Sequence, residues 1–171
     1  IETSQGKAPM ALLIDDGWAA AAAWDARLRT IDDLIARAEN DGRGVALVPL
    51  SETGRDISLE TPGAARVRAH KLSPKPHTPV RADALPALKR FLMATPSVEL
   101  IWLSDGVDIE KSQDFIDGLS ALTAQRGITV ILGGLAIPRA LTAAENTAGA
   151  LTVKVLRPLA DGASKIGRAH V

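Results

Sequence analysis

Four short apolar runs, separated by stretches with helical periodicity, constrain the fold of this chain more than any other feature of its sequence. Apolar runs of this length are typical of strands that are buried on both faces of a parallel sheet. Each run is followed by polar residues or glycine, where a strand is expected to end. We therefore predict strands at residues 10–14, 44–50, 98–103 and 128–132.

The segments between these runs carry apolar residues at helical spacing. Trp24, Leu28, Ile31 and Ile35 predict a long amphipathic helix, which Asn40-Asp41-Gly42 ends. Strands that alternate with such helices indicate an α/β, Rossmann-like fold, with a mainly parallel sheet of about five strands and helices on both faces. Further helices are predicted at residues 64–72, 81–93 and 108–125.

Two regions depart from this alternation. Ile57-Ser58-Leu59 is predicted to return as a short antiparallel edge strand, and residues 73–79 are predicted to form a loop because they contain three prolines. Near the C-terminus, alternating apolar and polar residues at 151–157 and a strand-like run at 167–171 predict a β-rich unit. We divide the chain into a linker (1–8), an α/β domain (9–147) and the start of the β-rich unit (148–171).

The composition argues against several classes of protein. Lys plus Arg equals Asp plus Glu at 20 each, so a general nucleic-acid binder is not expected. Because Cys is absent, a disulfide scaffold, a thiolate nucleophile and a Cys-ligated zinc site are excluded. We find no apolar run long enough for a membrane-spanning helix and no signal peptide, and we interpret the chain as a soluble piece of a longer protein.

Polar side chains follow two of the predicted strands directly. Asp15 and Asp16 follow the first strand, Ser104 and Asp105 end the third, and Thr78 lies in the proline-rich loop. Ligands of open parallel sheets bind beyond the carboxyl ends of the strands, so we expect these segments to converge. Two carboxylates and a hydroxyl provide the oxygen ligands that hard divalent cations prefer.

An apolar strand that ends in Asp, a long helix, and a distant strand that ends in Ser-Asp-Gly together resemble a von Willebrand factor A (vWA) domain. More narrowly, Leu-Ile-Asp-Asp-Gly-Trp with Trp24, and Ile-Trp-Leu-Ser-Asp-Gly-Val-Asp, resemble the vWA domains of bacterial membrane proteins of the aerotolerance-operon (Bat) type. The resemblance covers residues 9–135. It implies membrane anchors before this domain, a place on the periplasmic side of the bacterial inner membrane, and association with a MoxR-type ATPase system in envelope maintenance.

The metal-ion adhesion site of that family is Asp-x-Ser-x-Ser, a Thr and a later Asp. Carried over, the resemblance places these ligands at Asp15, Gly17, Ala19, Thr78 and Asp105. Gly and Ala have no side-chain oxygen, and Mg²⁺ tolerates the loss of ligands poorly. We therefore expect a degenerate site with no cofactor, or with weak Mg²⁺ binding at most. Serine at both positions 17 and 19 is predicted to recover some affinity.

Each of these residues also has a purely structural interpretation. Instead of holding a metal ion, Asp15 and Asp105 are suited to capping the helices that follow them or to binding loop amides. Asp16 is expected to be solvated, or to contact a partner together with Trp18. Trp18 itself is either a lid packed over the site or an exposed partner contact. Trp24 and Trp102 are expected to pack in the core.

Signatures of catalysis are missing from the sequence. It contains no Gly-x-Ser-x-Gly elbow and no Walker loop, and Gly133-Gly134 lacks a dinucleotide fingerprint. His70, His77 and His170 lack the spacing of a zinc site. A phosphoacceptor receiver domain would need an Asp at the end of a middle strand, where Leu47-Val48-Pro49-Leu50 has none.

The favoured hypothesis is a non-enzymatic protein-binding or scaffolding domain with a protein partner. The alternative is a divalent-metal-dependent hydrolase that uses Asp15, Asp16 and Asp105. A metal titration separates the two, because such an enzyme requires the ion and a scaffold does not.

Overall fold

The computed structural model describes residues 7–107, 112–124, 127–132, 140–147 and 150–156. Their main feature is a four-stranded, all-parallel sheet in the order β2-β1-β3-β4. Its strands are β1 (Met10–Ile14), β2 (Val45–Pro49), β3 (Glu99–Ser104) and β4 (Thr129–Leu132). The α/β, Rossmann-like prediction is therefore confirmed, with four strands in this sheet among the described residues instead of about five.

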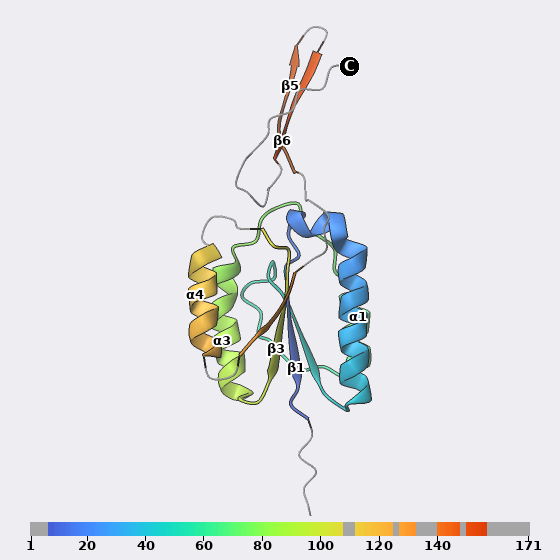
Figure 1. The fold of residues 1–171 in the computed structure, drawn as a ribbon, viewed down its shortest axis with the longest axis vertical. Coiled ribbons are helices and arrows are strands. Elements are labelled where there is room, and N and C mark those ends of the chain that lie inside the picture. The colour runs from blue at the N-terminus through green and yellow to red at the C-terminus, as the bar shows by residue number, and fades with distance from the viewer. Residues whose placement is uncertain (1–6, 108–111, 125–126, 133–139, 148–149, 157–171) are drawn as a thin grey trace, which may run out of the picture.

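Helices cover both faces of the sheet (Figure 1). The face of α1 (Trp24–Asn40) and α2 (Pro62–Ala69) lies opposite the face of α3 (Leu85–Ala94) and α4 (Ser112–Thr123). Two short 3₁₀ helices, η1 (Trp18–Ala23) and η2 (Arg81–Ala84), lead into α1 and α3. Pro86 lies in the first turn of α3, where its missing N–H has no helical partner to lose.

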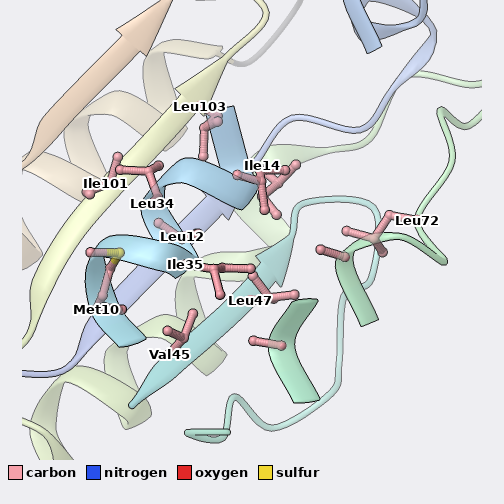
Figure 2. Packing of buried hydrophobic residues seen from close by; sticks show 14 residues of the cluster. Met10, Leu12, Ile14, Leu34, Ile35, Val45, Leu47, Leu72, Ile101 and Leu103 are labelled. Atoms are coloured by element: carbon pink, nitrogen blue, oxygen red, sulfur yellow. The ribbon is translucent and has the colours of Figure 1, made fainter. Parts of the chain in front are cut away.

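The two cores follow from the alternation of side chains along β1. Met10, Leu12 and Ile14 point towards α1 and pack with its residues Leu34 and Ile35 (Figure 2). The intervening side chains of β1 join the opposite cluster, formed with α3 and α4. All five residues of β1 are fully buried, which explains why its sequence is a continuous apolar run.

The two edges of the sheet are finished differently. At the β2 edge the backbone of Val45 exchanges hydrogen bonds with Glu60, and β2 is buried throughout. The prediction of an edge strand at residues 57–59 is therefore wrong, and this single bridge lies at the β2 edge instead. At the other edge, Val130 and Leu132 of β4 are 46% and 69% exposed.

The C-terminal part forms a separate antiparallel pair, β5 (Ala140–Thr147) and β6 (Ala150–Leu156). A strand was predicted over much of β6, and β5 begins before the predicted boundary at residue 148. The strand predicted at 167–171, the glycine pair 133–134, most of the linker and the first residues of the helix predicted at 108–125 lie outside the described residues. Among the helices that are described, none is long and apolar enough to cross a bilayer.

Candidate functional site at the strand ends

The order of the strands creates a crevice between β1 and β3. The chain leaves β1 for β2 on one side and later returns to β3 on the other, so the loops that follow β1 and β3 run apart. Such a switch point is where open α/β sheets bind ligands. Asp15 and Asp16 follow β1, and Asp105 follows β3, so the predicted convergence of these acids is present.

The guanidinium of Arg81 lies between Asp15 and Asp105. Its Nε donates to Oδ1 of Asp15 at 2.8 Å, and its Nη2 donates to Oδ2 of Asp15 at 3.1 Å. The same Nη2 also donates to Oδ1 of Asp105 at 2.7 Å. The side chains of Arg81, Asp15 and Asp105 are only 9%, 3% and 4% exposed, so this three-residue network is buried.

Further contacts hold the network in place. Nη1 of Arg81 donates to the carbonyl of Val107 and to Oγ of Ser112, both at 3.2 Å. The guanidinium also lies 5.9 Å from the ring centre of Trp102. Trp102 packs edge-on against Phe115, with 5.3 Å between ring centroids, and its partly buried side chain lies against the core, where it was predicted to pack.

Both carboxylates also accept hydrogen bonds from loop amides. Asp15 Oδ2 accepts from the amide of Asp105 at 3.0 Å, which joins the end of β1 to the end of β3. Asp105 Oδ1 accepts from the amide of Val107 at 2.9 Å. The loop-amide interpretation of these two acids is thus confirmed, and the ion pairs with Arg81 add to it.

A second guanidinium, that of Arg27, is buried behind the first. Arg27 belongs to α1, is 5% exposed, and donates to the carbonyls of Leu103 at 2.6 Å and Ser104 at 3.3 Å. These carbonyls end β3, so Arg27 ties α1 to the end of that strand. Burial lowers the pKa of Arg27, and the nearby charges of Asp15 and Asp105 oppose this shift.

Burial and the neighbouring charges shift the pKa values of Asp105 and Arg81. Burial raises the pKa of Asp105, the charge of Asp15 raises it further, and the charge of Arg81 opposes both. Burial would lower the pKa of Arg81, but the hydrogen bond and charge of Asp15, together with Asp105, raise it above its ordinary value. Arg81 is therefore a cation at neutral pH.

The structure places Asp16 in the interior, so the expectation of a solvated residue or a partner contact is wrong. Asp16 has no exposed surface, and its carboxylate accepts from the amide of Ser51 at 2.9 Å and from its hydroxyl at 2.5 Å. The carbonyl of Asp16 accepts from the amide of Lys75 at 2.7 Å. Burial raises the pKa of Asp16, and the Ser51 hydrogen bonds oppose the shift. Asp16 thus fastens three loops together.

Trp18 closes one side of the crevice and is half-buried. Its indole Nε1 donates to Oγ1 of Thr78 at 2.8 Å, and its amide contacts the carbonyl of His77 at 3.4 Å. The ring therefore holds the proline-rich loop against the end of β1. Trp24 is also half-buried and packs against the α1-side core, so it is a core residue only in part.

All five positions that the vWA resemblance assigns to metal ligands surround one shallow depression of about 10 Å³. That volume is about the size of a single water molecule. Serine at position 17 would not fit easily, because a Cβ on Gly17 would lie 2.6 Å from Cδ of Pro79. The depression is lined by Asp15, Gly17, Trp18, Ala19, Thr78, Pro79, Arg81 and Asp105.

These residues do not fit a divalent cation. Arg81 already occupies the space between the two carboxylates, and a cation there would have to displace its buried positive charge. Across the described part of the chain, no three His, Cys, Asp or Glu side chains are grouped so as to hold a metal ion.

Sequence reasoning missed the two arginines that complete the site. For Arg27 a signal exists, because it lies four residues before Ile31 and seven before Leu34, on the apolar face of α1. A charged residue on a buried helix face requires partners. For Arg81, which begins η2 just after the proline-rich loop, local sequence gives no comparable signal.

Comparison with known proteins adds no family: no family model matches the chain, and no curated protein matches it.

Proposed function

We propose that this domain is a non-enzymatic protein-binding or scaffolding module whose binding face lies at the carboxyl end of the sheet and operates without a bound metal. The observation that carries the proposal is the buried network in which Arg81 pairs with both Asp15 and Asp105. The carboxylates that an enzyme would use here already serve structural roles.

The same contacts weigh against the alternative, a metal-dependent hydrolase. A general base must reach a proton on the substrate or on a water molecule. Asp15 and Asp105 are directed at Arg81 and at loop amides, and Asp16 is directed at Ser51. Each acid is nearly inaccessible. A hydrolytic site would require these three groups to be released together.

The surface above the network suits contact with a protein. Trp18 is half-buried, and Val80, next to Arg81, is 47% exposed. The indole N–H of Trp18 is already used by Thr78, so Trp18 offers its apolar ring. Large rigid aromatic side chains contribute strongly to interfaces because little conformational entropy is lost when they are covered.

The resemblance to Bat-type vWA domains extends the proposal to the whole protein. On that basis the domain belongs to a membrane-anchored protein, faces the periplasm of a bacterial inner membrane, and binds another protein of the envelope. Nucleic acid is not proposed as a partner, because the chain has no net charge.

Site-directed photo-crosslinking tests the binding face. A photoreactive residue at Val80 is expected to form a discrete protein adduct in membranes of the source bacterium, also in the presence of EDTA. The same residue at Met93, which is 73% exposed at the end of α3, serves as the control. Equal adducts at both positions, or an adduct that EDTA abolishes, would contradict the proposal.

Two tryptophan variants make the test specific. Trp18→Ala is expected to reduce the Val80 adduct severalfold and to lower the melting temperature less than Trp24→Ala does, because Trp24 packs against the core. Adduct formation and melting temperature are measured on the same preparations. If Trp18→Ala destabilises the domain as much as Trp24→Ala and leaves the adduct intact, the ring is a structural clamp and not a contact.

A further inference from the structure

The strand-end site contains a positive charge of its own. Arg81 bridges a carboxylate that follows β1 and a carboxylate that follows β3, with donor–acceptor distances of 2.7–3.1 Å. We propose that the guanidinium of Arg81 takes the structural place of a divalent cation, so that the site excludes metal ions and its loops keep one arrangement with or without them. This inference rests on the proposed function and deepens it, because it concerns what keeps the same binding face in one arrangement.

Electrostatic repulsion acts between the two acids of the site. Two buried carboxylates on adjacent loops repel each other while both are ionised, and a cation between them offsets this repulsion. Arg81 supplies that cation, and its planar fork matches the two oxygens of Asp15. A single covalently attached residue therefore does what a bound ion would otherwise do.

A metal ion could enter the site only by displacing Arg81 from its contacts. Besides the two acids, Arg81 contacts the Val107 carbonyl, the Ser112 hydroxyl and the face of Trp102. An incoming ion would have to break all these contacts and leave a buried guanidinium without partners. In return it would gain an incomplete ligand set, since Gly17 and Ala19 supply no side-chain oxygen.

The neighbouring Arg27 provides a comparison, because its hydrogen bonds do not bridge two carboxylates. It is also a buried guanidinium, but its hydrogen bonds go to the carbonyls of Leu103 and Ser104. Carbonyl contacts tie a helix to a strand end without holding two acids together. Arg27 is therefore the matched control for a role that depends on bridging carboxylates.

The consequence is a permanently assembled binding face. A domain whose site needs a metal changes its loops when the ion binds or leaves. In this chain the bridging charge cannot dissociate, so we expect partner binding to be insensitive to divalent ions. Removal of Arg81 should convert the pair Asp15 and Asp105 into a site that accepts an ion, because Mg²⁺ can be held by two carboxylates together with water.

The test uses the full chain and the metal ion alone. Mn²⁺ and Mg²⁺ are titrated calorimetrically into the wild type, Arg81→Ala and Arg27→Met, and melting temperatures are measured with and without millimolar ion. Of the three proteins, only Arg81→Ala is expected to bind the ions. Its melting temperature should rise by about 5 °C at saturating Mn²⁺. Millimolar guanidinium is expected to raise it too, relative to an equal concentration of KCl.

If Arg81→Ala does not fold, Arg81→Gln replaces it, because its amide still donates to Asp15 while the charge is gone. Stoichiometric Mn²⁺ binding by the wild type, or a folded Arg81 variant that neither Mn²⁺ nor guanidinium stabilises, overturns the inference. Equal gains in Arg27→Met overturn it as well. These measurements need no partner, so they can fail while the crosslink at Val80 still forms, and the reverse also holds.

Discussion

Both ends of the parallel sheet carry an arginine–carboxylate network, and the two networks differ in their exposure to water. At the amino end, Glu99 of β3 accepts from Arg37 at 2.7 Å and also pairs with Arg43. The side chains of Arg37 and Glu99 are 50% and 35% exposed, whereas that of Arg43 is only 7% exposed. At the carboxyl end, the side chains of Arg81, Asp15 and Asp105 are all at most 9% exposed.

The difference in exposure decides what each network contributes. Exposed ion pairs are screened by water and contribute about 0–1 kcal/mol. A buried pair contributes little net stability when it forms, since desolvation offsets attraction, but losing one partner leaves a buried charge alone at a cost of roughly 3–5 kcal/mol. At the carboxyl end all three charges are buried, and they hold two loops in one arrangement. At the amino end only Arg43 is buried, and its partner Glu99 remains in contact with water.

The largest predicted effect is at the carboxyl end. Asp15→Ala removes two of the three carboxylate contacts of Arg81 and is expected to lower the free energy of unfolding by about 3–5 kcal/mol. Urea denaturation measures the loss. Asp56→Ala is the control, because the Asp56–Arg90 pair is exposed at 87% and 60% and should cost less than about 0.5 kcal/mol. Similar losses in both variants would remove the contrast between the two ends.

The next effect is steric and concerns the loop after β1. Gly17→Ser places a Cβ 2.6 Å from Cδ of Pro79 and 3.2 Å from the carbonyl of His77, and is expected to destabilise the domain by about 1–3 kcal/mol. Gly63→Ser is the control, since nothing lies within 4 Å of its added Cβ.

This result would also bear on metal binding. The sequence alone suggested that serine at positions 17 and 19 recovers affinity for Mg²⁺. The structure predicts no such gain while Arg81 is present. A stable Gly17→Ser variant that binds Mn²⁺ would show that the loop can rearrange and that Arg81 does not close the site.

The sequence was sufficient to predict the strands of the parallel sheet and the convergence of two of the site's acids. The apolar runs predicted all four strands of the parallel sheet. For β1 and β2 the physical reason is burial along the whole strand, which requires apolar residues throughout. The convergence of Asp15 and Asp105 followed from the rule that ligands lie at the carboxyl ends of parallel strands. Both predictions depend on local pattern plus topology, which a sequence contains.

The content of the site could not be predicted in the same way. Arg81 is 66 residues from Asp15 in the chain, and their hydrogen bonds depend on where a proline-rich loop delivers η2. Asp16 looked like a solvated loop residue because the chain offers no local sign of Ser51, 35 residues away, as its partner. Long-range polar pairing leaves no periodicity in a sequence.

A smaller effect is expected at the amino end. Glu99→Gln removes the charge that faces Arg37 and Arg43 and should lower the free energy of unfolding by about 1 kcal/mol at low salt. The loss stays small because Glu99 is 35% exposed and the buried Arg43 keeps Asp41 and the carbonyl of Ala8 as partners. Salt should shrink the difference, because the pair is partly exposed. Unfolding at low and high KCl measures this. A loss as large as that of Asp15→Ala, unchanged by salt, would place the buried network at the wrong end.

The last prediction compares how acids at the two ends respond to pH. Burial raises the pKa of Asp16 above its ordinary value of 3.8, so on lowering the pH the folded state takes up its proton before the unfolded state does. Asp16 therefore reduces stability at neutral pH, and this penalty fades as the pH falls towards 3.8. Asp41, at the amino end, has its pKa lowered by its hydrogen bond with Lys7, so it adds stability that is lost as the pH falls below 3.8.

The two acids should thus give slopes of opposite sign when each is replaced by its amide. We expect the stability of Asp16→Asn relative to the wild type to improve as the pH rises from 3.8, because the mutant lacks the penalty of a buried charge and its amide can still pair with Ser51. Asp41→Asn should instead lose ground as the pH rises towards 3.8, where the wild type regains its pair with Lys7. Urea unfolding across a series of pH values gives both curves. If the two curves run parallel, burial does not raise the pKa of Asp16. The difference in exposure between the two ends then does not extend to the titration of Asp16 and Asp41.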